Sequence, residues 1–478
     1  MKQNERTKFN ILLRVVVPVI IALVIWILPT PNGLSSNAWH VFAIFVAVIV
    51  AMITRPIQDI ESIAVLCGLT AVGVFSLASV SDIFSGYGSS TPWLILSAFL
   101  ICVAFLKSGF AVRLAYLLIR ALGKNILGVT YALGIADFIV GPATPSTTAR
   151  SAGIILPIAS GVMKAYGSEP LPSPTANRIG RYLCLTLPHI TMMTSAAFIT
   201  AMIANPLVVS FAKQILGVEI SWTLWTIAIL PIAIIGIIVI PIVYLYIVKP
   251  ELRKTPEAPL EAQKKLKEMG SMSRSEKVCL FTFVLAIVLW ATGQLHGIDA
   301  TIIGFLAGII LIAGGAITWD DIVKTKAAWN TVFWLAGMTS LAGILNKLGF
   351  FKWVANGIVG MMGGASATAM FIVFVLVVAF TGYGFASLTA RVSAIIPAFL
   401  GAASLTTLNP VGFTLAMGYA ISFGGILTHY SAASSPPWFG LGYMTFTDWL
   451  KNAFIMEIIL IAILIGIGIP YWSALGLW

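Results

Sequence analysis

Long apolar runs dominate the chain and indicate its fold class. Runs such as "VVVPVIIALVIWILP" and "IAILPIAIIGIIVIPIVYLYIV" carry hardly a polar side chain, and about 20 apolar residues are what a helix needs to cross a bilayer core. The short alternating segments of a membrane β-barrel do not match them. Only 9% of the residues are charged, against about 25% in a soluble domain. The pattern therefore predicts an all-α polytopic membrane protein.

Eleven of these runs predict transmembrane helices. We expect the spans at 11–29, 38–54, 60–80, 93–120, 182–204, 221–249, 278–294, 298–317, 329–347, 409–428 and 450–475. The first run follows several basic residues, as the apolar part of a signal peptide would. Its length, and the lack of a small-residue cleavage site before "PTPNG", favour an uncleaved helix.

Two further apolar stretches, 126–163 and 364–402, are interrupted by segments rich in proline, glycine and hydroxyl residues. We interpret each stretch as a re-entrant hairpin that enters and leaves the membrane on one side. Irregular backbone at membrane depth is tolerated only where protein or a water-filled cavity covers it. The tips of both hairpins should therefore line a cavity.

The chain repeats itself along its length. "FLKSGFAVRLA" at 105–115 recurs as "LNKLGFFKWVA" at 345–355, and Ser-x-Thr-Ala-Arg occurs at 146–150 and again at 387–391. The offset between matching positions stays between 239 and 241 residues, from the Asp-Ile pairs at 82 and 321 to the histidines at 189 and 429. So constant an offset indicates an internal duplication.

The basic residues indicate how the two copies are oriented. Lysine and arginine gather at the N-terminus, at 113–124, at 164–181 and in the polar linker 250–277. Eleven spans place all four segments in the cytoplasm, in agreement with the positive-inside rule, so the net charge of +11 need not indicate nucleic acid. The two repeats then have inverted topology, and the hairpin tips meet near the bilayer midplane as in secondary transporters.

The tips carry side chains that suit a carboxylate. Ser146, Thr147 and Thr148 come from one tip, and Ser387 and Thr389 come from the other. Hydroxyl groups and the amides at a helix N-terminus favour an anion. A serine in a membrane helix often bonds only its own backbone, but a matched set in two hairpins favours a binding site.

Each hairpin also holds an arginine, Arg150 or Arg391. An arginine within a membrane is costly unless it is paired or lines a pathway. Asp137 offers Arg150 a partner, whereas the second hairpin contains no comparable acid. Arg391 is therefore expected either to supply positive potential to a bound anion or to cap hairpin carbonyls.

A second polar cluster follows each hairpin. Its candidates are His189, Thr194, Ser195, Asn205 and Pro206 in the first repeat, and His429, Ser431, Pro436 and Pro437 in the second. The prolines predict helix breaks. Each histidine is either a packing residue or a group whose charge changes near neutral pH, for coupling to protons or to substrate charge.

Four segments, "TPSTTARSAGIILPI", "SLTARVSAIIP", "TSAAFITAMIANPL" and "LTHYSAA", resemble the divalent anion/sodium symporter family. The chain is most similar to its exchanger branch, the 2-oxoglutarate/malate and citrate/succinate translocators, over essentially its whole length. The resemblance implies eleven spans plus two hairpins, a homodimer, and an elevator motion of a transport domain against a scaffold. It also implies di- or tricarboxylate substrates.

The resemblance implies a Ser-Asn-Thr signature at each tip, which contacts carboxylates and, in sodium-coupled members, helps to form sodium sites. Here the motifs are Ser146-Thr147-Thr148 and Ser387-Leu388-Thr389, so both asparagines are replaced. A hard cation prefers oxygen ligands, and the Leu388 side chain offers none. We therefore expect sodium-independent exchange of 2-oxoglutarate, malate, succinate or fumarate; the alternative is a sodium-coupled di- or tricarboxylate symporter. The candidates for part of the charge compensation are the cations Arg150, Arg391, His189 and His429.

The repeat and the resemblance together suggest domain limits. Scaffold helices are expected at 1–125 and 278–363, a hairpin with transport-domain helices at 126–249 and again at 364–478, and a solvated cytoplasmic linker at 250–277. We expect a multi-pass protein of the plasma membrane with a cytoplasmic N-terminus and an external C-terminus. It should form a homodimer and bind small dicarboxylate anions and lipid, without nucleic acid, metal or cofactor; its four cysteines lack metal-ligand spacing.

Other functional classes are disfavoured. The chain contains no HExxH, GxSxG or GxxxxGK[ST] motif, which argues against an intramembrane enzyme and against an ATP-driven pump. An anion channel is the other rival, because the same hydroxyl groups could line a pore. A counterflow experiment distinguishes the two. External dicarboxylate accelerates efflux through a carrier, whereas a channel shows electrical conductance.

Overall fold

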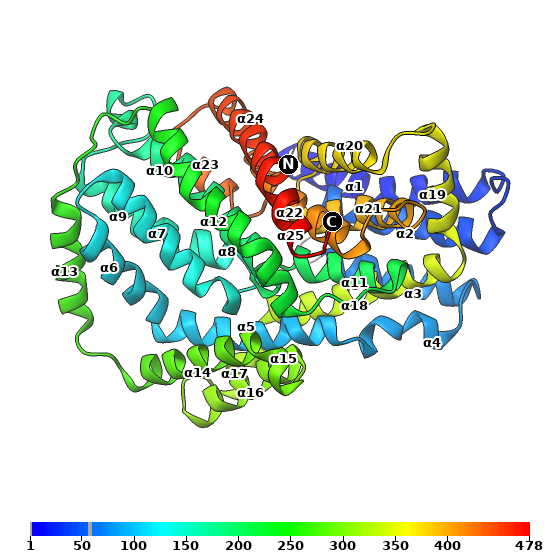
Figure 1. Ribbon diagram of the computed structural model, residues 1–478, viewed down its shortest axis with the longest axis horizontal. Helices are drawn as coiled ribbons and strands as arrows, with labels where there is room; N and C mark the ends of the chain where they lie inside the picture. Colours follow the sequence, from blue (N-terminus) through cyan, green and yellow to red (C-terminus); the bar gives the residue numbers. More distant parts are fainter. Residues whose placement is uncertain (1, 56–59) are drawn as a thin grey trace.

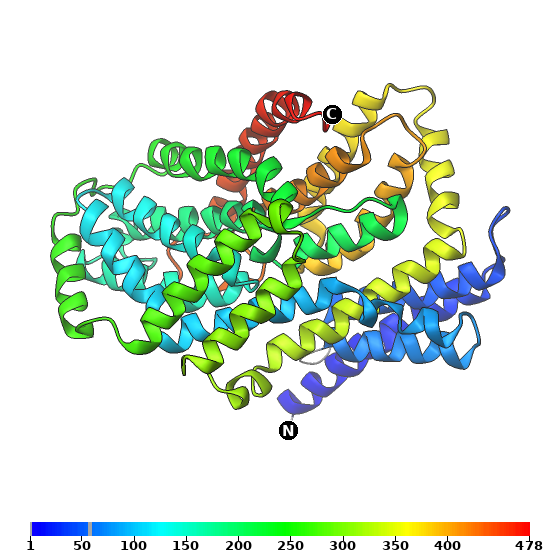
Figure 2. The ribbon, with the colours of Figure 1, turned by 60° about the horizontal axis from the view of Figure 1, so that its bottom comes forward.

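The structure is a computed structural model that describes residues 2–55 and 60–478, with side chains from residue 15 onward. Its described residues form helices and no β-strand, arranged in one elongated body (Figure 1). Figure 2 shows the N-terminus and the C-terminus at opposite edges of this body. The basic side chains expected to flank the first span, those of Lys2, Arg6, Lys8 and Arg14, lie outside the described part.

Twenty-five α-helices follow one another in the described residues. The first half contains α1 (Lys2–Ile27), α2 (Ser36–Thr54), α3 (Ile60–Val74), α4 (Val80–Ile83), α5 (Ser90–Ser108), α6 (Phe110–Leu122), α7 (Ile126–Val140), α8 (Thr147–Arg150), α9 (Leu156–Ala165), α10 (Gly180–Ala197), α11 (Ala204–Leu216) and α12 (Trp222–Ile247). The second half contains α13 (Glu257–Met269), α14 (Arg274–Ala291), α15 (Gly293–His296), α16 (Ala300–Ala313), α17 (Trp319–Val323), α18 (Lys326–Lys347), α19 (Phe350–Met361), α20 (Ala367–Phe380), α21 (Leu388–Ala403), α22 (Pro410–Phe423), α23 (Pro436–Phe439), α24 (Phe446–Ile463) and α25 (Ile469–Ala474).

Length and apolarity confirm the predicted class. Seven helical stretches in the described residues are long and apolar enough to cross a membrane, and shorter apolar helices such as α3, α16 and α22 accompany them. A bilayer core requires about 20 residues of helix. The chain is therefore an all-α, multi-pass membrane protein.

The expected single span at 93–120 is wrong. α5 ends at Ser108, Gly109 adopts the left-handed conformation (φ 77°), and α6 begins at once in a new direction. The second repeat has the same break, at Gly349 (φ 78°) between α18 and α19. A left-handed glycine ends a helix without steric cost, and apolar residues on both sides of it concealed the break in the hydrophobic pattern.

Both interrupted stretches form helix–turn–helix segments. In the first, α7 leads through a 3₁₀ turn (Gly141–Ala143) to α8, which continues through a π-helical turn (Ser151–Ile155) into α9. In the second, α20 leads through a 3₁₀ turn (Thr381–Gly384) to α21. We refer to them as hairpin 1 and hairpin 2.

The two repeats meet through α5 and α18, which pack against each other. Lys107, at the end of α5, pairs at 2.6 Å with Asp321, which lies just before α18. Lys347, at the end of α18, pairs at 2.8 Å with Asp82, which lies just before α5. The end of each helix thus meets the start of the other, so the two equivalent helices are antiparallel. The two ion pairs are equivalent to each other, as a two-fold axis between the repeats requires. The repeats are inverted relative to each other.

The segment 250–277 is more ordered than the expected solvated connector. It contains α13, which packs against α6. Its backbone also donates hydrogen bonds to two of the other basic segments, from Leu252 N to Arg178 O (3.1 Å) and from Thr255 N to Lys124 O (3.0 Å). Three of the basic segments therefore lie together on one side of the protein.

Candidate functional site

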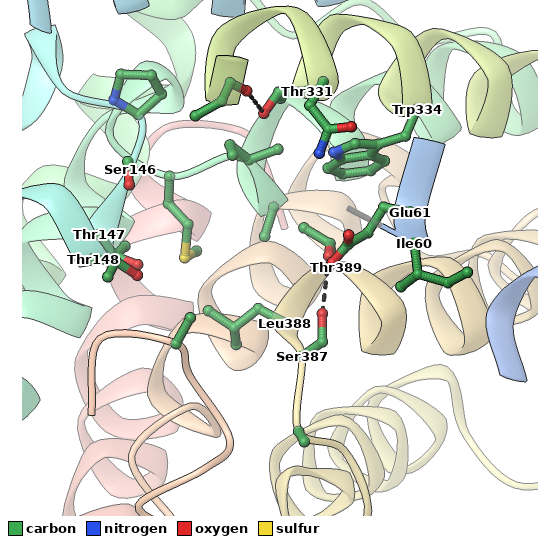
Figure 3. A pocket seen from close by; sticks show the side chains of 18 of the residues that line it. Ile60, Glu61, Ser146, Thr147, Thr148, Thr331, Trp334, Ser387, Leu388 and Thr389 are labelled. Carbon is green, nitrogen blue, oxygen red and sulfur yellow. Dashed lines mark hydrogen bonds between the residues drawn. The ribbon is translucent and has the colours of Figure 1, made fainter. Parts of the chain in front are cut away.

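One cavity of about 390 Å³ receives both hairpin tips. Its lining includes Ser146, Thr147 and Thr148 from hairpin 1 and Ser387, Leu388 and Thr389 from hairpin 2. Figure 3 shows the two groups of side chains on different sides of the same space. The tips that the sequence singled out are thus brought together.

A serine begins the second helix of each hairpin. Ser146 Oγ accepts a hydrogen bond from Ala149 N (3.2 Å), and Ser387 Oγ accepts one from Ala390 N (3.3 Å). Ser387 Oγ also lies 3.0 Å from Thr389 Oγ1. An N-cap serine uses an oxygen lone pair for the cap and keeps its O–H as a donor. Each tip therefore presents a hydroxyl group and a helix N-terminus, both of which favour an anion.

Arg150 is fully buried and forms the expected pair with Asp137. Its Nε donates to Asp137 Oδ1 at 2.8 Å. Its Nη1 donates to the carbonyl oxygens of Thr144 (2.9 Å) and Ala201 (3.0 Å). The charge of Arg150 is therefore balanced within the protein, and the side chain connects hairpin 1 to the segment after α10.

Thr194 and Ser195 contact this pair and lie outside the set of described residues that line the cavity. Thr194 Oγ1 donates to Asp137, and Ser195 Oγ accepts from Arg150 Nη2. Both were expected at the substrate. They orient the buried ion pair instead.

Arg391 is also buried, and it caps carbonyl groups. Its Nη1 donates to Gly424 O at 2.8 Å and its Nη2 donates to Ile421 O. These carbonyls belong to the C-terminal end of α22, not to the hairpin as expected. A cation is favoured at a helix C-terminus. Each arginine therefore connects its hairpin by hydrogen bonds to the helix break that follows it in the chain.

The predicted helix break of the first repeat lies where Arg150 binds. α10 ends at Ala197 and α11 begins at Ala204, and Asn205 Nδ2 holds this break by donating to Ser195 O (2.8 Å) and Phe198 O (2.9 Å). Pro206 lies in the first turn of α11.

In the second repeat the helix already ends at Phe423, and Pro436 and Pro437 begin the short helix α23. The prediction that these prolines break the helix is therefore wrong, because the break precedes them. Ser431 Oγ donates to Gly382 O (2.7 Å) and holds the intervening loop against hairpin 2.

Both histidines are packed among aromatic rings. His189 is buried, with its Nδ1 2.6 Å from the hydroxyl oxygen of Tyr244. His429 stacks on Phe439, with 4.1 Å between the ring centroids. Neither belongs to the described residues that line the cavity, so the structure places both as packing residues there.

Sequence reasoning missed a third side of the cavity. Asn330, Thr331 and Trp334 come from the first turns of α18. Arg55 directly follows α2, and Glu61 lies in the first turn of α3. Arg55 Nη2 donates to Glu61 Oε1 at 2.7 Å, and Arg55 is the one lysine or arginine among the described residues lining the cavity. No repeat or hydroxyl motif marks these positions in the sequence. The one available signal was the charge of Arg55 and Glu61, which lie at the edges of the apolar runs 38–54 and 60–80.

Comparisons with known proteins agree over the whole chain. The model of the sodium:sulfate symporter transmembrane region matches residues 10–478. The chain is 37% identical to the putative malate transporter YflS of Bacillus subtilis, over 98% of this chain and 97% of that protein. It is 34% identical to the chloroplastic dicarboxylate transporter 1 of Spinacia oleracea, over 96% and 81% of the two chains. It is 32% identical to the L-tartrate/succinate antiporter of Escherichia coli O6:K15:H31, over 95% and 97%.

A solved structure shares the fold. The YdaH transporter of Alcanivorax borkumensis superposes with a TM-score of 0.53, at 13% identity, over 86% of this chain and 90% of that one. At such low identity the likeness concerns the fold alone. The full-length family match and the three relatives show that the chain belongs to the sodium:sulfate symporter family, the divalent anion/sodium symporters that its hairpin motifs resemble.

Proposed function

We propose that this protein exchanges C4 and C5 dicarboxylates across the membrane, without sodium, by an elevator movement of the hairpins. The observation that carries the proposal is the convergence of two capping serines, from inverted repeats, on one cavity. A dicarboxylate has two anionic ends, and each hairpin tip offers one of them a hydroxyl group and a helix N-terminus. Malate, succinate, fumarate and 2-oxoglutarate share this chemistry.

The cavity and the named relatives support this class of substrate. A volume of about 390 Å³ lies within the range of small-molecule sites, about 300–1,000 Å³. The relatives are named as malate, dicarboxylate and tartrate/succinate transporters. The guanidinium of Arg55, which is paired with Glu61, adds a positive charge to the lining of the cavity.

The tip residues support sodium independence. Thr147 and Leu388 occupy the positions where the family signature has asparagine, and both line the cavity. Leu388 has no side-chain oxygen for a cation, and one relative is named an antiporter. Because Asp137 already balances Arg150, that arginine does not supply the free charge that was expected to replace sodium. A sodium-coupled symporter, which the printed name of the family favours, is the alternative.

Two cavities support alternating access. The substrate cavity lies beside the first turns of α18, whereas a larger one of about 950 Å³ lies beside Thr339, the start of α5 and residues 293–301. At the second cavity α11 touches α18: Ser210 Oγ lies 3.1 Å from Thr339 Oγ1, and Gln214 Nε2 donates to Thr339 O at 2.8 Å. An elevator movement would break these contacts and open the site toward the second cavity.

We further propose an orientation of the protein in the membrane and a homodimeric assembly. The positive-inside rule supports a cytoplasmic location for the side on which the basic segments cluster. The termini at opposite edges (Figure 2) then support an internal N-terminus and an external C-terminus. In this arrangement the substrate cavity lies toward the cytoplasmic end of α18, whose start meets the end of α5. The family resemblance further suggests a homodimer with the helices of 1–125 and 278–363 as its scaffold.

Counterflow into proteoliposomes tests the proposal. Vesicles preloaded with unlabelled malate should take up external labelled malate at equal rates in sodium, potassium or choline. Vesicles without internal dicarboxylate should take up little, even with an inward sodium gradient. Sodium-driven accumulation in empty vesicles would establish the symporter instead, and conductance without counterflow would establish a channel.

A further inference from the structure

The second cavity, of about 950 Å³, has neither hairpin tip among its described lining residues. Its lining includes the starts of α5 and α16. The lining of the substrate cavity includes the starts of α18 and α3. Each of these helices has its repeat counterpart at the other cavity, so the walls of the two cavities can be compared residue by residue.

The first turns of α18 and α5 occupy equivalent places at the two cavities. The offset of 240 residues that relates Lys107 to Lys347 also relates the lining residues of these turns. They are Asn330, Thr331 and Trp334 at the substrate cavity, and Ser90, Thr91 and Leu94 at the second cavity.

A repeated hydrogen bond supports this correspondence. Ser62 Oγ on α3 donates to Asn330 O at 3.0 Å. Thr301 Oγ1 on α16 donates to Ser90 O at 3.5 Å. The two hydroxyl residues are 239 positions apart, within the offset of the repeats. The starts of α3 and α16 are therefore held against α18 and α5 in the same way.

The same offset of 239 residues relates the positions at which the two walls differ in charge. It relates Arg55, Ile60 and Glu61 at the substrate cavity to Gln294, Asp299 and Ala300 at the second cavity. The guanidinium of the first wall thus has an uncharged amide as its counterpart. An apolar side chain of the first wall has a carboxylate as its counterpart.

The net charge of the two linings differs in consequence. Arg55 and Glu61 are the charged residues among the described lining of the substrate cavity, and they balance each other. The described lining of the second cavity has Lys213 paired with Glu219 at 2.6 Å, and Asp299 in addition. The second cavity therefore has one more negative charge.

We propose that Ser90, Thr91, Gln294 and Asp299, which we call the external wall, face the dicarboxylate when the carrier opens to the outside, and that this wall binds the dianion more weakly than its counterpart at the substrate cavity does. The inference rests on the proposed exchange function and adds a difference in affinity between the two sides of the membrane. The hairpin tips supply the same hydroxyl groups in both positions, so the difference comes from the scaffold.

Coulomb repulsion explains the weaker binding. Asp299 caps α16 by accepting a hydrogen bond from Thr301 N at 2.8 Å, and its carboxylate repels a dianion in the same cavity. Gln294 offers no positive charge to offset this repulsion. Because the cavity is solvated, one such charge changes the affinity by about two- to fivefold.

Exchange kinetics measured from each side test the proposal. Intact cells preloaded with malate report the external KM for malate, and inverted membrane vesicles preloaded with malate report the cytoplasmic KM. Asp299→Asn keeps a capping oxygen and removes the charge, so the external KM should fall about two- to fivefold while the cytoplasmic KM stays unchanged. Gln294→Arg should have the same effect, and Arg55→Gln should raise the cytoplasmic KM alone.

Leu295→Arg is the matched control. Leu295 follows Gln294 on α15, is 86% exposed, and lies outside the described residues that line the second cavity. The same added charge at this position should leave both KM values unchanged. An external KM that falls equally with Leu295→Arg would show a general effect of surface charge and would overturn the role of the external wall.

The outcomes separate this inference from the proposed function. If wild type exchanges malate but Asp299→Asn and Gln294→Arg leave the external KM unchanged, or change both KM values equally, the external wall does not face the substrate. Absence of malate counterflow in wild type would overturn the proposed function instead. The substituted side chains are exposed, so the variants are expected to fold.

Discussion

The capping serines at the hairpin tips each accept one backbone hydrogen bond and retain a hydroxyl proton. If that proton is donated to a substrate carboxylate, Ser146→Ala and Ser387→Ala each remove a hydrogen bond to a charged group, worth about 1.5–3 kcal/mol. The dissociation constant for malate should rise about tenfold to a hundredfold. Titration of the purified variants with malate measures this directly.

Ser366 offers a matched control. It caps α20 in the same manner, accepting from Ala369 N at 3.2 Å, and it lies outside the described residues that line the cavity. Ser366→Ala should therefore leave malate affinity unchanged. Equal weakening by all three alanine variants would show that the lost cap, and not a substrate contact, is responsible.

The ion pair of Arg55 and Glu61 at the cavity is expected to affect malate binding. The carboxylate of Glu61 partly neutralises Arg55, which is 52% exposed. Glu61→Gln should strengthen malate binding because it releases this cation, and Arg55→Gln should weaken it by a few-fold, since the site is solvated. Opposite signs in uptake affinity are expected. Changes of the same sign would mean that the pair only stabilises the loop.

The buried ion pair of Arg150 and Asp137 stabilises hairpin 1 and its contact with the segment after α10. The side chains of Arg150 and Asp137 are 0% and 2% exposed. Removing one partner leaves an uncompensated buried charge, at a cost of about 3–5 kcal/mol. Asp137→Asn should therefore lower the unfolding temperature of the purified protein strongly. The exposed pair of Lys265 and Glu268 is the control, and Glu268→Gln should shift that temperature little.

The sequence predicted the elements that leave a periodic or repeated signal. The hairpins and their serine tips were predicted from interrupted apolar runs and a constant offset. The Arg150–Asp137 pair was one of two interpretations of Arg150, because Asp137 lies on the same hairpin. The break at Gly109 was not, because the hydrophobic pattern is the same for a straight helix and a broken one. Arg55 meets the tips only through tertiary packing, and that relation is not encoded locally.

At the scale of the whole molecule, exposed ion pairs link the repeats. Lys107 holds the pKa of Asp321 below its usual range, and Lys347 does the same to the pKa of Asp82. A carboxyl whose pKa is lowered by folding contributes stability above its unfolded value, about 3.9, and loses it as pH falls through the folded value. Acidification below about pH 4 should therefore lower the unfolding temperature.

Neutral variants of the two lysines check this origin. Lys107→Met and Lys347→Met should be slightly less stable than wild type near pH 7, and the difference should disappear in acid, because the partner aspartates are then protonated. The effect is small, since both pairs are exposed. A stability difference that persists unchanged at acidic pH would point to lost packing of the lysine side chains.

Because each repeat contributes one lysine and one aspartate to these bridges, either half is complementary to a second copy of itself. Two identical halves, one turned over in the membrane, would meet with the same two bridges at opposite ends of the crossing helices. A short ancestral chain that inserted in both orientations would already have possessed this contact as an antiparallel pair. Fusion into one polypeptide then needed only a connecting segment. After fusion, the sequences of the two halves could diverge without loss of the two ion pairs between them.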